Sequence, residues 1–171
     1  MTYGPNLIVS ADDSNFASSI GNWISIPTLG GPYFYWTATA GGNAKLKQAI
    51  IPEVEIMGEL EKTYFNPPGK SKIYLMACTA FVPPLPAECE VGIRLTGSPT
   101  TELKATAAHT SGDTWQYLSK QIKIPLDFDN NNRKLELFAI NLPSSWDILF
   151  NGISIKQIIK MIQYLPVIGV G

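Results

Sequence analysis

The chain has 171 residues, of which 45% are hydrophobic and 16% are charged, and its formal net charge is -1. This size and composition fit one folded domain with a packed core, and they exclude an extensively disordered chain. The balanced charge argues against electrostatic binding of nucleic acid, and no apolar run is long enough for a membrane span. The N-terminus lacks the basic and apolar regions of a secretory signal, so we expect none.

Short segments rich in β-branched and aromatic residues recur along the chain, bounded by Gly, Pro, Asn and Asp. In chain order the predicted strands are 6–10, 32–39, 44–50, 71–80, 88–96, 102–108, 115–124, 133–141 and 146–158. Segment 88–96 alternates between apolar and polar residues, whereas 71–80 is continuously apolar, as expected for a strand buried on both faces. About nine strands with frequent turn signals predict an all-β sandwich of two antiparallel sheets.

Helical signals are few. Residues 53–65 contain Gly58 and are flanked by prolines, so we expect a strand or an irregular crossover there. Apolar residues near helical spacing in the second half of 153–165 leave a short C-terminal helix open. No repeat and no linker is visible, so we expect one domain over residues 1–158 and an apolar tail over 159–171.

The two cysteines, Cys78 and Cys89, each lie in an apolar run typical of a strand. They could form a disulfide between neighbouring strands in an oxidising compartment, or they could stay buried thiols that behave as small hydrophobic residues. Because nothing in the sequence indicates export, we expect free thiols.

Catalytic motifs are missing from the sequence. His109 is the single histidine, and there is no nucleophile elbow, P-loop, dinucleotide fingerprint or zinc-ligand spacing. A glycosidase needs two carboxylates at a set separation, and no arrangement of the 14 acidic residues nominates a pair. We therefore expect a protein that is not an enzyme.

Four segments, taken in order, resemble the jelly-roll carbohydrate-binding modules that accompany xylanases and other glycoside hydrolases. They are the opening NLIVSADDSNFASSIGNW, the long strand in GKSKIYLMACTAFV, the Trp-initiated and Pro-terminated TSGDTWQYLSKQIKIP, and the closing WDILFNGISIKQI. The resemblance extends over residues 6–158 and rests on the order of the segments rather than on a unique motif. It implies a jelly-roll β-sandwich, and it makes glycan binding the expected function, although a fold alone does not fix a function.

Glycan binding needs aromatic rings for the apolar face of a pyranose and polar side chains for its hydroxyls. In segment 115–124 and just after it, Leu118, Ile122 and Ile124 have the spacing of core residues, so the intervening side chains face outward. The predicted glycan contacts are Tyr33, Tyr35, Trp115, Tyr117 and Gln121. A role in packing the rim of the sandwich is the alternative for each aromatic residue, and Trp23 and Trp146 are assigned to the core.

The same resemblance implies a structural calcium site, because the family commonly holds calcium with acids near its opening Phe and in its last strand. The matching positions here are Asp12, Asp13 and Asn151. Carboxylates raise the affinity for calcium, so the amide of Asn151 argues against this site, and we expect no cofactor with calcium as the open alternative. The oxygen-rich loop 127–132 lacks the glycine and the bidentate acid of an EF-hand, so we interpret it as a solvated turn.

The C-terminal segment KMIQYLPVIGVG is almost wholly apolar and would be adhesive if it were exposed. We expect it either to dock on a neighbouring copy or another protein, or to fold back as an edge strand of its own sheet. The predicted docking residues are Met161, Ile162, Tyr164, Leu165, Val167 and Ile168.

These features predict a non-catalytic, glycan-binding jelly roll that decorates or attaches a larger assembly. A bacteriophage virion is the expected setting, since such particles carry accessory proteins with folds similar to sugar-binding modules. Many weak sites on a particle could then hold it to a glycan-coated surface by avidity. Two alternatives stay open: an extracellular module detached from a polysaccharide-degrading enzyme, and a purely structural virion protein that binds no sugar.

Overall fold

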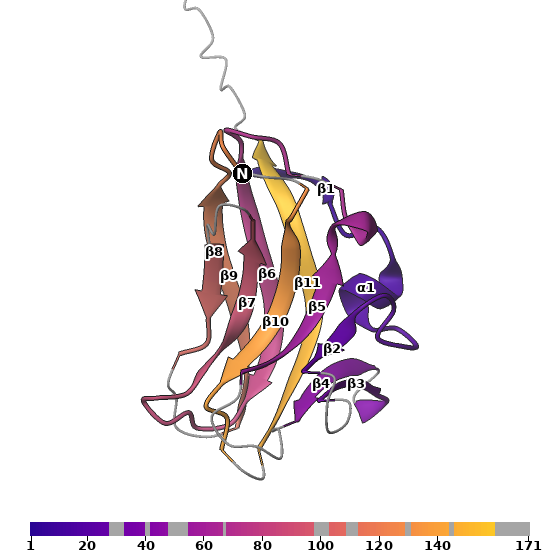
Figure 1. Cartoon of the computed structure of the whole chain (residues 1–171), viewed down its shortest axis with the longest axis vertical. Helices are drawn as coiled ribbons and strands as arrows, with labels where there is room; N and C mark the ends of the chain where they lie inside the picture. Colours follow the sequence, from indigo (N-terminus) through magenta and orange to yellow (C-terminus); the bar gives the residue numbers. More distant parts are fainter. Residues whose placement is uncertain are drawn as a thin grey trace, which may run out of the picture.

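The computed structural model describes residues 1–27, 33–39, 42–47, 55–66, 68–97, 103–108, 113–128, 131–143 and 146–159. Within these residues two antiparallel sheets lie face to face as the two layers of a β-sandwich (Figure 1). The all-β, two-sheet architecture expected from the sequence is therefore confirmed. Among the described residues no helix has the length and apolar character of a membrane span.

The six-stranded sheet has the order β3-β4-β11-β6-β9, and β1 pairs with the other end of β11. Its strands are β1 (Thr2–Asn6), β3 (Phe34–Thr37), β4 (Asn43–Lys47), β6 (Ile73–Val82), β9 (Thr114–Lys123) and β11 (Asp147–Ile159). The five-stranded sheet has the order β2-β5-β10-β7-β8. Its strands are β2 (Ile24–Ile26), β5 (Ile56–Glu61), β7 (Glu90–Thr96), β8 (Leu103–Thr106) and β10 (Lys134–Ile140).

Differences from the predicted elements are concentrated near the N-terminus. β1 ends at Asn6, and beyond it Ile8 forms only an isolated bridge with Phe65. The short helix α1 (Ala11–Asn15) follows, with the Ser10 side chain accepting a hydrogen bond from the backbone N–H of Asp13. Neither α1 nor β2 was predicted from the sequence.

Residues 53–65 contain β5 and then the single 3₁₀ turn η2 (Lys62–Tyr64), so the strand alternative holds for most of the described part. Gly58 lies within β5 and does not interrupt it. The absence of a side chain at Gly58 leaves space for the ring of Phe34. A Cβ atom at Gly58 would lie 2.7 Å from the ring of Phe34. The glycine therefore lets a fully buried aromatic ring of the facing sheet pack directly on the backbone.

The hydrophobic core fills the space between the sheets. Its largest fully buried side chains include Phe16, Phe34, Phe128 and Phe150. Trp23 is in this core and donates from Nε1 to the carbonyl of Asp13 at 2.8 Å, as its assignment to the core requires. Cys78 and Cys89 are buried free thiols, which confirms the expectation for both.

Strand β6 corrects one expectation, because it is not buried on both faces. Met76, Cys78 and Ala80 point into the core and are fully buried, while Ile73 on the opposite face is exposed. Phe81 on that face is only partly buried. The reason is the two-layer architecture, in which every strand has one face turned away from the partner sheet. Ile73, Leu75 and Phe81 on the outward face of β6 are therefore part of the protein surface, whereas Ala77 on the same face is buried.

Candidate functional site: the outward face of the six-stranded sheet

A continuous row of side chains crosses five strands on the outward face of the six-stranded sheet. The strand register places Tyr35 opposite Lys45, Lys45 opposite Leu149, Leu149 opposite Phe81 and Phe81 opposite Trp115. Residues directly opposite each other on paired strands lie on the same face of a sheet. With neighbouring strands about 4.8 Å apart, this aromatic row, Tyr35–Lys45–Leu149–Phe81–Trp115, spans about 19 Å.

Strand β9 supplies one end of the aromatic row through strict alternation. Leu118 and Ile122 point inward and are 3% and 2% exposed, whereas Trp115 and Tyr117 point outward and are 45% and 64% exposed. Gln121 is also exposed. The predicted outward direction of Trp115, Tyr117 and Gln121 is confirmed, and the six-stranded sheet presents all three on one surface.

The rings at the Trp115 end contact each other. The centroids of Phe81 and Trp115 are 5.5 Å apart, with the ring planes inclined at 60°. Phe81 was missed because the apolar run around it predicted burial on both faces, and only the pairing of β6 with β9 reveals its contact with Trp115. The two rings form an apolar surface to which a third ring-shaped group could be added.

A cation lies at the other end of the aromatic row. Lys45 Nζ is 2.7 Å from an Asp147 carboxylate oxygen and 5.9 Å from the ring centroid of Tyr35. The hydrogen bond to Asp147 raises the pKa of Lys45, and the negative charge of Asp147 adds to the effect. The ammonium group therefore stays charged beside Tyr35, where it offers hydrogen-bond donors to a ligand on the sheet.

A second row of polar side chains runs beside the aromatic row. Tyr117 lies opposite Thr79, and Thr79 lies opposite Asn151. The amide of Asn151 donates to the carbonyl of Gly42 at 2.6 Å and to Asn43 Oδ1 at 3.2 Å. This surface thus combines exposed rings with amide and hydroxyl groups, which are the types of group that recognise a sugar.

Tyr33 is the one predicted glycan contact that the structure moves away from this surface. It is 5% exposed and belongs to the hydrophobic core. Its backbone N–H donates to Ser25 Oγ at 2.9 Å, and its carbonyl accepts from Lys47 at 2.8 Å, so it joins β2 to β4. The prediction for Tyr33 is corrected, because strand alternation gives the side of a residue but not whether other segments cover it.

The residues predicted for calcium do not fit a metal site. The Asp13 carboxylate accepts from the backbone and side-chain nitrogens of Asn22 at 2.6 and 2.9 Å, and it is buried. Asp12 accepts from the backbone N–H of Ser18 at 2.8 Å, a hydrogen bond that lowers the pKa of Asp12. The side-chain amide of Asn151 donates its N–H groups to the carbonyl of Gly42 and to Asn43 Oδ1. The Asp12 and Asp13 carboxylates therefore accept from N–H donors, and Asn151 presents N–H groups rather than an oxygen to its neighbours. In the described part of the chain no cluster of His, Cys, Asp or Glu is placed to hold a metal ion.

Two carboxylates face each other on the outward side of the five-stranded sheet, where Glu59 lies opposite Glu136. Lys134 Nζ is 2.9 Å from Glu59, and Arg94 Nε donates to Glu136. Arg94 also contacts Glu55 at 2.6 Å. Each of these carboxylates is therefore held by a cation, and the cluster is an ion-pair network across β5, β10 and β7.

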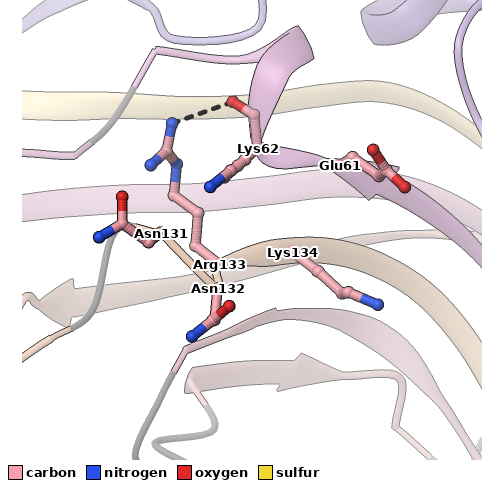
Figure 2. Close-up of a pocket in the computed structure, with 6 residues that line it drawn as sticks. All are labelled: Glu61, Lys62, Asn131, Asn132, Arg133 and Lys134. Carbon is pink, nitrogen blue, oxygen red and sulfur yellow. Dashed lines mark hydrogen bonds between the residues drawn. The ribbon is translucent and has the colours of Figure 1, made fainter.

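A small cavity of about 150 Å³ lies near the start of β10, lined by Glu61, Lys62, Asn131, Asn132, Arg133 and Lys134 (Figure 2). Arg133 donates from Nη2 to the carbonyls of Lys62 and Phe65 at 2.9 and 3.3 Å. Its guanidinium carbon is 5.1 Å from the ring centroid of Phe65. Figure 2 shows the side chains of Glu61 and Lys134 extending away from Arg133. We interpret Arg133 as a structural connection between η2 and β10.

Some predicted features lie outside the described residues. They are His109, part of the loop 127–132, and the docking residues Met161, Ile162, Tyr164, Leu165, Val167 and Ile168. Their roles stay predictions.

No protein-family model matches the sequence, and no curated protein matches it. Solved structures of carbohydrate-binding modules do match the fold. The structure described as "Family 16 Carbohydrate Binding Module-2" has a TM-score of 0.58 at 13% identity, over 88% of this chain and 99% of that chain. The CBM22-1 xylan-binding domain of Paenibacillus barcinonensis Xyn10C has a TM-score of 0.60 at 11% identity, over 92% of this chain and 97% of that chain.

A third match is the Clostridium thermocellum xylanase 10B CBM22-1–GH10 structure complexed with xylohexaose, with a TM-score of 0.56 at 15% identity. It covers 90% of this chain and 29% of that chain. At these identities the similarity shows the fold alone. The chain has the jelly-roll fold of carbohydrate-binding modules, which confirms the resemblance seen in the sequence.

Proposed function

We propose that this chain is a non-catalytic glycan-binding module, and that a polysaccharide chain binds along the aromatic row. The observation that carries the proposal is the register that aligns Tyr35 and Trp115 on one face, with Leu149 and Phe81 between them. Two of the solved structures with this fold are described as xylan-binding or as bound to xylohexaose, which supports a sugar as the ligand.

The chemistry of the row suits a sugar chain. Trp115 and Tyr117 are exposed enough to stack on the C–H faces of pyranose rings, and burial of these aromatic surfaces provides most of the affinity. Gln121, Ser119 and Lys45 supply donors and acceptors for hydroxyl groups. Because these strands are hydrogen-bonded within a sheet that packs on the hydrophobic core, the rings are already in position and little conformational entropy is lost on binding.

The proposal is tested by measuring binding to a glycan array and to soluble polysaccharides with the variants Trp115→Ala, Tyr117→Ala and Tyr35→Ala. Loss of a central aromatic contact should weaken binding by about tenfold or more. Tyr64→Ala is the matched control, because Tyr64 is 42% exposed in η2, outside the six-stranded sheet. Binding that survives all three changes, or no binding to any glycan, would remove this site.

We also propose that the module acts as an accessory subunit that decorates or attaches a larger assembly such as a virion, with segment 159–171 as the docking element. The apolar composition of this segment supports the proposal. A chain that ends at residue 158 should lose assembly with its partner while it keeps glycan binding. Unchanged assembly would count against this segment as the docking element.

A further inference from the structure

The two sheets differ in charge. The described strands of the six-stranded sheet contain five lysines and one acid, Asp147, and the lysines are Lys45, Lys47, Lys120, Lys123 and Lys156. The strands of the five-stranded sheet contain four glutamates and three basic residues. Since the whole chain has a net charge of -1, positive charge is concentrated on the sheet that carries the aromatic row.

Four of these lysines lie on the outward face itself. Lys45 is a member of the aromatic row, and Lys47 lies opposite Asp147 at the next outward position of β4. Toward the other end of the sheet, Lys156 lies opposite Leu75, and Lys123 lies opposite Ile73. The lysines therefore flank the exposed rings on both sides along the strand direction.

Asp147 neutralises only part of this charge. It pairs with Lys45 at 2.7 Å, and the two side chains are 41% and 23% exposed, so water screens the pair. Within the described strands of this sheet no second acid offsets Lys47, Lys123 or Lys156. A polyanion that lies along this face would meet Lys47 near one end of the sheet and Lys123 and Lys156 near the other.

We propose that the ligand of this face is an acidic polysaccharide, a chain of sugars that carry uronate carboxylates. This inference rests on the proposed function and names its ligand class. The aromatic rings contact the C–H faces of the sugars, Lys45 and Lys47 donate charge-assisted hydrogen bonds to carboxylates near Tyr35, and Lys123 and Lys156 attract the rest of the chain. A neutral glycan uses the rings and the hydrogen-bond donors of Lys45, but it gains nothing from the charges of Lys47, Lys123 and Lys156.

The test compares polygalacturonate with the same polymer after reduction of its carboxyl groups, so that the two ligands differ in charge but not in linkage. We expect the acidic polymer to bind about tenfold more tightly, and its affinity to fall when the salt concentration is raised from about 20 mM to about 200 mM. The variants Lys47→Gln and Lys123→Gln/Lys156→Gln should each weaken binding of the acidic polymer and leave binding of neutral glycans unchanged. Lys62→Gln, which removes an exposed lysine outside this sheet, is the control and should change neither.

The possible failures are distinguishable. Equal, salt-independent affinity for the two polymers, or binding to neutral glycans alone, would overturn the inference and leave the proposed function standing. Binding to no glycan of the array would overturn both. Stronger binding of a single-stranded oligonucleotide than of the acidic polymer would also overturn the inference, because stacked bases and phosphates would then explain the same rings and lysines.

Discussion

Trp115 packs against Phe81 of the neighbouring strand, with ring centroids 5.5 Å apart. Trp115 is 45% exposed while Phe81 is partly buried, so Phe81 fixes the orientation of the more exposed ring. We expect Phe81→Ala to weaken glycan binding by about two- to tenfold, since such an aromatic pair contributes about 0.5–1.5 kcal/mol. Isothermal titration calorimetry measures the change.

Phe81→Leu keeps an apolar contact beneath the indole and should restore most of the affinity. The melting temperature of each variant should be compared with that of Trp115→Ala. If Phe81→Ala binds glycan as tightly as the unchanged protein, Trp115 does not depend on Phe81 for its position, and the aromatic row is not a single binding surface.

The buried thiols give a second prediction. Burial raises the pKa of Cys78 far above its ordinary value, and burial together with Glu88 raises the pKa of Cys89 to about 11. Because the thiolate is the reactive form, we expect neither cysteine to react with a thiol reagent at about pH 8 while the protein is folded. Both should react once the protein is unfolded in urea, and mass spectrometry distinguishes zero, one and two additions. Rapid modification of either thiol in the folded protein would contradict this.

Local sequence was sufficient for the strands whose two faces differ chemically. In β9 the inward Leu118 and Ile122 and the outward Tyr117 follow the alternation in the sequence, so that both the strand and its outward face were predicted correctly. It was insufficient for α1, which has only five residues, ADDSN, and no apolar period. Its ends depend instead on the Ser10 cap and on the left-handed conformation of Phe16.

The candidate site could be predicted only in part, because it is a property of strand pairing. Tyr35 and Trp115 were proposed separately, and nothing in the sequence shows that three intervening strands align them in one row. Phe81 lies in an apolar run in which inward and outward residues look alike. Tyr33 shows the opposite error, since its burial depends on packing that strand alternation cannot reveal.

Calcium should not stabilise this protein. Asp12 and Asp13 accept hydrogen bonds from Ser18 and Asn22, and the Asn151 amide donates to Gly42. We therefore expect the melting temperature to be the same in EDTA and in millimolar calcium. Asn151→Asp should destabilise the protein, because it removes this N–H donor and places a carboxylate 2.6 Å from a carbonyl oxygen. A rise in the melting temperature of the unchanged protein with calcium would contradict the prediction and restore the metal site.

The ion-pair network of the five-stranded sheet predicts a pH effect. Burial raises the pKa of Glu136 above its ordinary value of 4.5, Arg94 opposes the rise, and Glu59 and Glu55 add to it. The folded protein thus holds the proton of Glu136 more tightly than the unfolded chain does. The contribution of Glu136 to the free energy of unfolding therefore falls as the pH rises from the pKa of the unfolded chain through the higher pKa of the folded protein.

Glu136→Gln imitates the protonated side chain and should remove this contribution. We expect the variant to gain stability relative to the unchanged protein between about pH 4 and about pH 7, in urea unfolding at each pH. A difference in the free energy of unfolding that is constant with pH would show that folding does not shift the pKa of Glu136. A difference that moves in favour of the unchanged protein as the pH rises would show that Arg94 and not burial dominates the titration of Glu136.

Arg133 gives the last prediction, which separates a structural cavity from a binding site. Its guanidinium group donates to the carbonyls of Lys62 and Phe65 and packs on the Phe65 ring, and the residue is buried. Arg133→Met keeps the apolar stem but leaves both carbonyls without this donor, so we expect a loss of about 2–3 kcal/mol in the free energy of unfolding.

Lys62→Gln is the matched control, because Lys62 contributes a backbone carbonyl and its own side chain is exposed. It should leave both stability and glycan affinity unchanged. Arg133→Met should also leave glycan affinity unchanged at a temperature where the variant is folded, since the cavity does not belong to the six-stranded sheet. Loss of glycan binding by Arg133→Met without loss of stability would move the binding site from the aromatic row to this cavity.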